Sequence, residues 1–292
     1  IIHYIIRSVN LVRKGEVMKN KRRYFDMHTH SENSHDCAEK VENIAKAAAD
    51  NCAVGIAVTD HCDIEFFDTV DLRKICENSI KDAITCDMQS DITVLHGIEM
   101  GEAHWHTNVA QALLNEFDFD AVIGSVHAVR YSGYDMPYSQ IDFSEMGKVE
   151  TKKYFDKYLD DVICMLEKCD IDILAHLTCP LRYINGKFEL GVDCKRYERK
   201  ITEILKYIVR NNIALELNTS CMCGGRYSKL MPEEWVVELY KSLGGYLITT
   251  GSDAHIAENT ALSFDCLYKF IAELGFESVY YYKNRRAIPF VI

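Results

Sequence analysis

YFDMHTH (residues 24–30) is the stretch that decides the fold, because it ends an apolar strand in a group of metal-ligating side chains. Its aromatic and apolar residues are typical of a short strand, and a polar turn follows His30. On an ideal strand, residues two apart share a face, so His28 and His30 can reach one metal ion. Two ordinary surface histidines would give the same pair, and the motif alone does not separate these interpretations.

The same arrangement recurs along the chain, where other apolar runs end in a histidine or a carboxylate. These residues are Asp60 with His61, Glu99, His127, His176, and Asp253 with His255 in GSDAH. Segments with helical periodicity separate the runs, at residues 38–51, 71–89, 106–116, 145–169, 194–210 and 258–274. Apolar strands that alternate with helices predict a parallel sheet covered by helices. A parallel barrel collects its strand ends at one face, so these side chains would converge in one multinuclear metal site.

Composition limits the class of protein. The 292 residues suit one α/β barrel, which we expect to close with a short strand at residues 276–282. The net charge of -11 argues against binding of long nucleic acids, which usually requires a basic face. The 12 cysteines are scattered through predicted helices and strands, which favours a reducing, cytoplasmic compartment over a disulfide framework. No apolar run in the sequence reaches the ~20 residues of a membrane span.

The N-terminus predicts a separate short segment. Residues 1–17 precede Met18, and Lys14-Gly15-Glu16 can be encoded by bases that contain a bacterial ribosome-binding sequence. We therefore expect residues 1–17 to be a translated leader or an accessory segment, and residues 18–292 to form a single barrel domain. Mass spectrometry of the native protein checks this, since a mature chain that contains residues 1–17 excludes the leader.

Other histidines are weaker candidates for the predicted metal site. His96 lies inside a predicted strand and is typical of a core histidine. His104 and His106 come just after the third strand, where they can line a substrate pocket or begin a helix. His35 and Asp36 compete for one ligand position after the first strand.

Eight motifs together resemble one known family, the polymerase-and-histidinol-phosphatase (PHP) family. In order they are DMHTHSENSHD, AVTDH, HGIEMGE, IGSVH, AHLTCP, ELNTS, TTGSDAH and YYYKNRRAIP. The resemblance covers roughly residues 24–290 and extends, within the family, to the histidinol-phosphate phosphatases. It implies a distorted (β/α)7 barrel, similar to a TIM barrel, with three divalent metal ions at the carboxyl ends of the strands.

The resemblance also implies which residues bind each metal ion. The first ion takes His28, His30, Glu99 and Asp253, the second takes Glu99, His127 and His176, and the third takes Asp36, His61 and His255. Asp36 is assigned because the family's ligand lies six residues after the second histidine of the first motif. The family uses zinc, iron or manganese, and nitrogen and oxygen ligands without thiolates suit all three.

The implied reaction is hydrolysis of a phosphate monoester, with L-histidinol phosphate of histidine biosynthesis as the expected substrate. Its products would be L-histidinol and phosphate. A hydroxide that bridges metal ions would attack phosphorus in line. Asp253 and His255 are the candidates that would supply a proton to the leaving alkoxide.

Phosphate dianions are usually bound by a cationic side chain as well as by metal ions. Arg182, shortly after the fifth strand, is our first choice, and Arg130, after the fourth, is the second. Asn218 and Ser220 at the sixth strand end, together with His104, are further candidates for substrate contacts. Each arginine could instead be a solvated loop charge.

Alternative functions are distinguished by the same residues. The closest alternative keeps the site and changes the substrate to a nucleotide or another small phosphate ester. A non-catalytic module of a larger protein is disfavoured, because all nine ligand positions are filled. An amidohydrolase barrel also has an HxH motif and a terminal Asp, but its bridging lysine has no clear counterpart and Glu99 fills that role. The expected partner is therefore a small phosphate monoester, and the sequence does not determine an oligomeric state.

Overall fold

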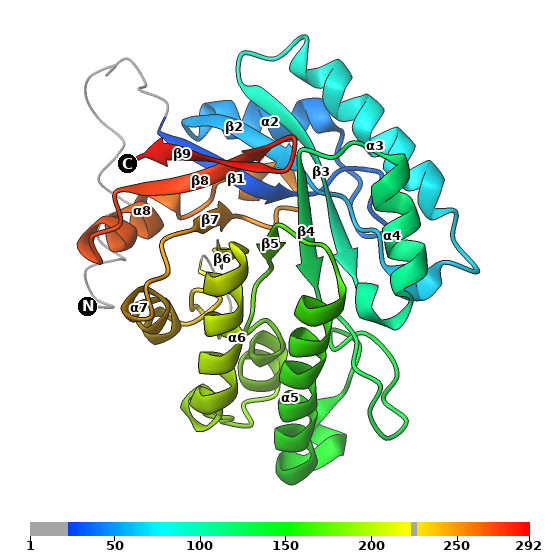
Figure 1. The fold of residues 1–292 in the computed structure, drawn as a ribbon, viewed down its shortest axis with the longest axis vertical. Helices are drawn as coiled ribbons and strands as arrows, with labels where there is room; N and C mark the ends of the chain where they lie inside the picture. Colours follow the sequence, from blue (N-terminus) through cyan, green and yellow to red (C-terminus); the bar gives the residue numbers. More distant parts are fainter. Residues whose placement is uncertain (1–22, 223–226) are drawn as a thin grey trace.

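Strands and helices alternate along the chain, as predicted (Figure 1). The computed structural model describes residues 23–222 and 227–292, and the expected leader at residues 1–17 lies outside them. The barrel strands are β1 (Tyr24–Thr29), β2 (Ala53–Val58), β3 (Thr93–Gly101), β4 (Ala121–Ser125), β5 (Ile173–Leu174), β6 (Ala214–Asn218) and β7 (Ile248–Gly251). The helices are α2 (Val41–Asp50), α3 (Leu72–Asp87), α4 (Thr107–Glu116), α5 (Phe143–Lys168), α6 (Glu198–Asn211), α7 (Glu234–Ser242) and α8 (Phe264–Glu273).

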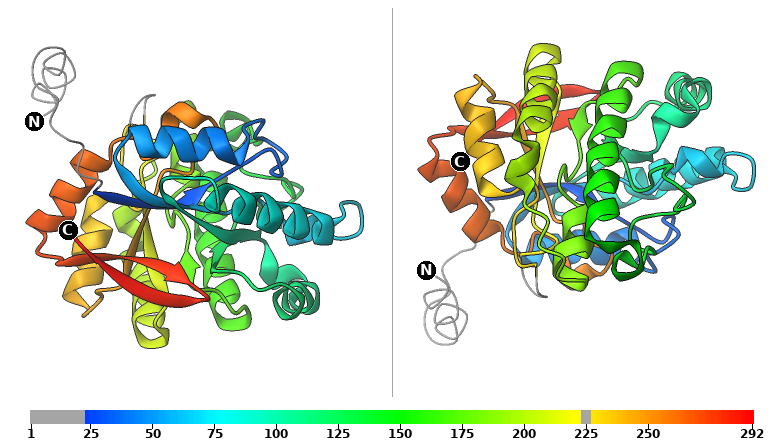
Figure 2. Two further views of the ribbon diagram at one scale, coloured as in Figure 1. Left: turned by 90° about the horizontal axis from the view of Figure 1, so that it is seen from above. Right: turned by 90° about the horizontal axis from the view of Figure 1, so that it is seen from below.

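The seven strands form one parallel sheet in the order of the sequence, β1 to β7. Its first and last strands meet at their carboxyl ends, where the Asp253 amide donates to the His28 carbonyl at 2.8 Å. The His30 amide donates in turn to the Ala254 carbonyl at 3.0 Å. The sheet is therefore a nearly closed barrel wrapped by helices, and the predicted distorted (β/α)7 fold is confirmed (Figure 2).

The helices cover the barrel because their apolar residues recur with helical spacing. Helix α6 shows this most clearly, with Ile201, Ile204, Leu205 and Ile208 buried on one face. These side chains belong to the large core cluster between the helices and the outer face of the sheet. Within the described ranges, no helix is both long and apolar enough to cross a membrane.

Strand β1 contains a bulge that places two successive side chains on the inner side of the barrel. As β1 advances from Asp26 to Thr29, its partner β2 advances by only two residues. Met27 packs in the apolar core of the barrel, and the next residue, His28, also faces the strand-end site. His28 and His30 still face the same Glu99 oxygen, so their expected shared face is retained despite the bulge.

The chain ends in a two-stranded antiparallel hairpin and not in the single short strand expected at residues 276–282. Strands β8 (Ser278–Lys283) and β9 (Arg286–Val291) are joined by a two-residue turn. Both turn residues, Asn284 and Arg285, have positive φ, at 49° and 59°. Turns of this kind usually contain glycine, and its absence hides this one from the sequence.

This hairpin covers the amino-terminal end of the barrel, opposite the strand-end site. Asp120, just before β4, accepts a hydrogen bond from the Asn284 amide at 2.9 Å. Tyr282 donates to the carbonyl of Asp172, just before β5, at 3.1 Å. Tyr282 also packs in the apolar core of the barrel, so the hairpin closes that core at the amino-terminal ends of the strands.

Candidate metal centre

Glu99, at the end of β3, is the fully buried centre of the strand-end histidines. Its Oε2 atom lies 3.4 Å from His28 Nε2 and 3.6 Å from His30 Nε2. Its Oε1 atom lies 3.2 Å from His127 Nε2 and 3.1 Å from His176 Nε2. The Oε2 atom also lies 2.9 Å from His61 Nδ1. One carboxylate therefore faces three histidines with one oxygen and two with the other, as a ligand shared by metal ions must.

Asp253 completes the first of these groups. Its Oδ1 atom lies 3.2 Å from His30 Nε2 and 3.8 Å from His28 Nε2. Asp253 has a positive φ of 53° and follows β7, whose end meets the end of β1. The closure of the barrel thus brings together the ligands predicted for the first metal ion.

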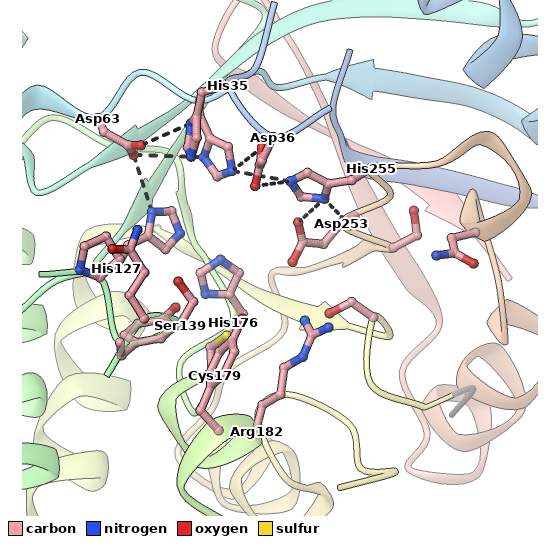
Figure 3. Close-up of a pocket in the computed structure, with 18 of the residues that line it drawn as sticks. His35, Asp36, Asp63, His127, Ser139, His176, Cys179, Arg182, Asp253 and His255 are labelled. Atoms are coloured by element: carbon pink, nitrogen blue, oxygen red, sulfur yellow. Dashed lines mark hydrogen bonds and ion pairs between the residues drawn. The ribbon is translucent and has the colours of Figure 1, made fainter. Parts of the chain in front are cut away.

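A third group forms around Asp36. Its carboxylate oxygens lie 3.6 Å from His61 Nε2 and 3.2 Å from His255 Nε2. The two histidine nitrogens are 3.4 Å apart, and the close-up shows Asp36 and His255 facing one another (Figure 3). The side chain of His35 is 67% exposed, with its Nδ1 atom 3.9 Å from Asp63. The geometry therefore favours Asp36 over its neighbour for this ligand position.

Several donor atoms of these groups fit metal ions. In the described part of the chain, His28 Nε2, His30 Nε2 and Glu99 Oε2 are buried and have no hydrogen-bond partner. Such atoms are rare in folded proteins, because desolvation without a partner is costly. The donor set contains imidazole nitrogens and carboxylate oxygens, and it therefore suits zinc, iron or manganese.

In three of the ligand imidazoles the other ring nitrogen is held by a specific partner. His28 Nδ1 lies 2.6 Å from Glu216 Oε1, and His30 Nδ1 lies 3.0 Å from Ser34 Oγ. His255 Nδ1 lies 3.0 Å from a backbone carbonyl oxygen. A donating Nδ1–H leaves the lone pair of Nε2 free to bind a metal ion, so these contacts set the useful tautomer.

The sequence analysis missed the residues that orient the ligands. Glu216 lies inside an apolar strand, Ser34 lies in a turn, and Asp63 Oδ1 lies 3.4 Å from His127 Nδ1 after β2. A buried Glu in a strand is an unusual signal that could have identified Glu216. The sequences around Ser34 and Asp63 carry no comparable signal.

Two carboxylates beside the strand ends brace the backbone and do not face the ligand groups. Asp26 accepts hydrogen bonds from the Ser252 amide at 2.9 Å and the Ser252 hydroxyl at 2.6 Å. Asp60 accepts from the hydroxyls of Ser34 and Ser79, at 2.8 Å and 2.6 Å. Burial raises the pKa of Asp26 to about 6, although its hydrogen bonds to Ser252 act in the opposite direction.

The electrostatics of the cluster favour the protonation states that a metal ligand needs at His30 and Glu99. Burial lowers the pKa of His30 to about 3, with help from His61 and His255 nearby. Burial by itself would raise the pKa of Glu99, but His28 and His127 hold it well below its ordinary value. His30 is therefore neutral and Glu99 ionised near neutral pH.

A cavity of about 640 Å³ opens over this cluster. It is lined by His127, His176, Asp253 and His255, and by Arg182, which begins the short π-helix η3 (Arg182–Lys187) and whose side chain points into the cavity (Figure 3). Ser220 also lines the cavity. Of the predicted substrate contacts, Arg182 and Ser220 therefore face the same space as the ligand groups.

The other three predicted substrate contacts lie elsewhere. The exposed Arg130 places its guanidinium 4.1 Å from the centre of the Trp105 ring, outside the cavity lining. His104 is buried, with Nε2 3.8 Å from Asp161 on α5. Asn218 is also buried, and its Oδ1 atom accepts a hydrogen bond from the Ser220 hydroxyl at 2.7 Å. Arg130, His104 and Asn218 therefore do not line this cavity, and their roles as substrate contacts stay predictions.

Known proteins share the sequence of this chain over most of its length. A model of the PHP domain family matches residues 26–220, about two thirds of the chain. A probable histidinol-phosphatase of Clostridium acetobutylicum is 27% identical over 263 residues, which make up 89% of this chain and 97% of that protein. A histidinol-phosphatase of Lactococcus lactis is 25% identical, over 87% of this chain and 92% of its own.

Solved structures share the fold. The crystal structure of the histidinol phosphate phosphatase of Lactococcus lactis, complexed with zinc, L-histidinol and phosphate, has a TM-score of 0.70 at 22% identity. The alignment covers 91% of this chain and 99% of that structure. A putative histidinol phosphatase from Listeria monocytogenes also has a TM-score of 0.70, at 17% identity. The family model spans most of the barrel, and the matched residues include most of the strand-end cluster. The chain therefore belongs to the PHP domain family.

Proposed function

We propose that this protein is a metal-dependent phosphatase that hydrolyses L-histidinol phosphate to L-histidinol and phosphate in histidine biosynthesis. The observation that carries the proposal is the buried Glu99, whose two oxygens face five histidines. Two relatives that match nearly their full length are named histidinol-phosphatases, one of them as probable, which supports the choice of substrate. The free thiols of the described cysteines agree with a reducing, cytoplasmic compartment.

Three divalent cations, zinc, iron or manganese, would fit the ligand groups. The first would be held by His28, His30, Glu99 and Asp253, the second by Glu99, His127 and His176, and the third by Asp36, His61 and His255. Bound there, the cations would supply positive charge for the phosphoryl oxygens and lower the pKa of a water molecule.

The side chain of Arg182 supplies a further positive charge on the opposite wall of the proposed phosphate site. It is only partly exposed and lines the cavity together with His176 and Ser220. A guanidinium can bind two oxygens of a phosphate group at once, so it both attracts and orients the dianion. The hydroxyl of Ser220 offers one more hydrogen bond beside it.

Asp253 and His255 stay our candidates for handling the proton of the leaving alkoxide, because both line the cavity. Burial by itself lowers the pKa of His255, but Asp36 and Asp253 raise it above its ordinary value. Burial raises the pKa of Asp253, but His28 and His30 hold it well below its ordinary value. These directions describe the site without cations, and a His255 that binds a cation through Nε2 carries no proton on that nitrogen.

The rest of the cavity suits a cationic leaving group. L-histidinol carries an amine and an imidazole, and Asp63 and Glu65 place two carboxylates on the cavity wall. Phe66 and Tyr138 line the same space and offer aromatic rings. Carboxylates and aromatic faces both attract organic cations, which supports an amine-bearing phosphate ester over an anionic nucleotide.

The test is a phosphate-release assay on purified protein, stripped of metal and then supplied with zinc, iron or manganese. We expect L-histidinol phosphate to be hydrolysed with a higher kcat/KM than nucleoside monophosphates or p-nitrophenyl phosphate. Equal or faster hydrolysis of nucleotides would defeat the histidinol assignment and favour the alternative substrate class. Full activity without any metal would defeat the proposed metal dependence.

A further inference from the structure

Glu216 contacts ligands of two different metal positions with one buried carboxylate. It lies on β6, and its side chain is almost completely buried. We infer that Glu216 is a positioning residue that couples the first and second metal positions. The inference rests on the metal centre of the proposed function, and it assigns a role to a residue that is not itself a ligand.

The two contacts of Glu216 are short and use different oxygens. Its Oε1 atom lies 2.6 Å from Nδ1 of His28, a ligand of the first position. Its Oε2 atom accepts the backbone N–H of His176, a ligand of the second position, at 2.6 Å. The first contact fixes the tautomer of the His28 imidazole, and the second fixes the backbone position of His176 after β5. Each ligand therefore depends on the same side chain.

Gly251, the last residue of β7, makes room for this arrangement. A Cβ atom at Gly251 would lie 2.2 Å from Glu216 Oε1 and 2.7 Å from the Cβ atom of His28. Cβ atoms essentially never make non-bonded contacts this short, so a side chain here would push Glu216 and His28 apart. The first residue of the GSDAH motif must therefore be glycine on steric grounds, independently of the metal ligands beside it.

The chemistry of the carboxylate predicts a specific effect of Glu216→Gln. Both neighbours are N–H donors, and a carboxylate can accept from both because each of its oxygens is an acceptor. A glutamine of the same shape has only one acceptor oxygen, so its NH2 group must face one of the two donors. The substitution therefore breaks one of the two contacts. It also weakens the other, because a neutral amide oxygen is a poorer acceptor than a carboxylate oxygen, while all nine predicted ligands stay in place.

The experiment is a zinc titration of metal-free wild-type protein, Glu216→Gln and Asp120→Asn, with a chromophoric chelator as competitor. Asp120 is a matched control, since it is a buried carboxylate that holds backbone N–H groups at the opposite end of the barrel. We expect Glu216→Gln to weaken zinc binding at two positions by about 10-fold to 100-fold. Asp120→Asn should bind zinc as the wild type does.

Each result decides between the inference and the proposed function. Wild-type affinity of Glu216→Gln, or weakening of one position only, would overturn the inference alone. Failure of the wild type to bind zinc would overturn the proposed metal centre as well. If Glu216→Gln does not fold, proton NMR of the zinc-loaded wild type decides, because the Nδ1–H of His28 should be protected from exchange, and rapid exchange of that proton contradicts the inference.

Discussion

At the scale of single residues, Glu99 has the largest predicted effect. Glu99→Gln keeps the shape of the side chain but removes the negative charge that faces five histidines. We expect kcat to fall by at least about 100-fold, with loss of bound metal, because a shared ligand serves two positions. Metal analysis and phosphate release measure both effects. Glu77→Gln, an exposed change on α3, is the control, and equal losses in both variants would contradict the assignment.

The two arginines proposed from the sequence now give a matched comparison. Arg182 lines the cavity, whereas Arg130 stacks on Trp105 outside its lining. Arg182→Lys keeps the charge but loses the bidentate hydrogen bonding of the guanidinium, so kcat/KM should fall on the order of 10-fold to 100-fold. Arg130→Lys should stay near the wild type. Steady-state kinetics with L-histidinol phosphate measure this, and the reverse order would show that the phosphate binds at Arg130.

Selectivity for a cationic leaving group is predicted to depend on Glu65. In the described part of the chain its carboxylate has no hydrogen bond or ion pair, and it lines the cavity. Glu65→Gln should lower kcat/KM for L-histidinol phosphate by roughly 10-fold, equivalent to ~1.4 kcal/mol. Hydrolysis of p-nitrophenyl phosphate, which has no cationic group, should be unchanged. Asp68→Asn in the same loop is the control, and an equal loss on both substrates would exclude a role in selectivity.

At the scale of elements, the terminal hairpin is predicted to stabilise the barrel without affecting the site. Arg285 in its turn places Nε 2.9 Å from Asp172 Oδ2 and Nη1 3.0 Å from Asp170 Oδ2. Arg285→Met would leave the largely buried Asp172 without its cation, and we expect a loss of about 1–3 kcal/mol in the free energy of unfolding. Chemical denaturation of the metal-free protein measures this loss.

The neighbouring residue of the same hairpin provides the control for that prediction. Arg286 is exposed, and Arg286→Met should leave both stability and activity unchanged. Arg285→Met should keep the wild-type kcat, because the hairpin contacts the amino-terminal ends of the strands. A lower kcat with unchanged stability would show that the hairpin acts on the site instead.

At the scale of the whole molecule, metal binding is predicted to release protons. Burial lowers the pKa of His61, but Glu99 and Asp63 raise it to about 9, and the pKa values of His28 and His127 are raised well above the ordinary range by neighbouring carboxylates. These imidazoles hold protons near neutral pH, and a bound metal ion must displace them. Zinc affinity should therefore fall as the pH is lowered from about 9.

Calorimetric zinc titrations in buffers of different ionisation enthalpy count the released protons. We expect roughly one to four protons per chain at pH 7, one for each ligand imidazole whose pKa is raised, His255 included. Zinc affinity should fall with falling pH for the same reason. Below the raised pKa values, the metal-free form binds more protons than the zinc-loaded form, so protons compete with zinc. Zinc binding with no proton release and no dependence on pH would contradict this account of the cluster.

Much of the site was predictable because of one property of the barrel. A parallel barrel brings every strand end to the same face, so a ligand such as His176 could be assigned from its place after an apolar run. The structure brings the nine predicted ligands into three groups around Glu99. Asp36 is an exception, since it lies in a turn and was assigned from the family spacing alone.

Sequence alone thus determined the alternation of strands and helices, the barrel and the residues at its strand ends. Only the tertiary structure decided which side chains orient the ligands, which of Arg182 and Arg130 enters the cavity, and how the last strand is paired. The reason is physical. Strand and helix periods are local and repeat along the chain, whereas the contact of Glu216 with His28 joins residues 188 positions apart. Such contacts depend on the closure of the barrel and leave no pattern in the sequence around either residue.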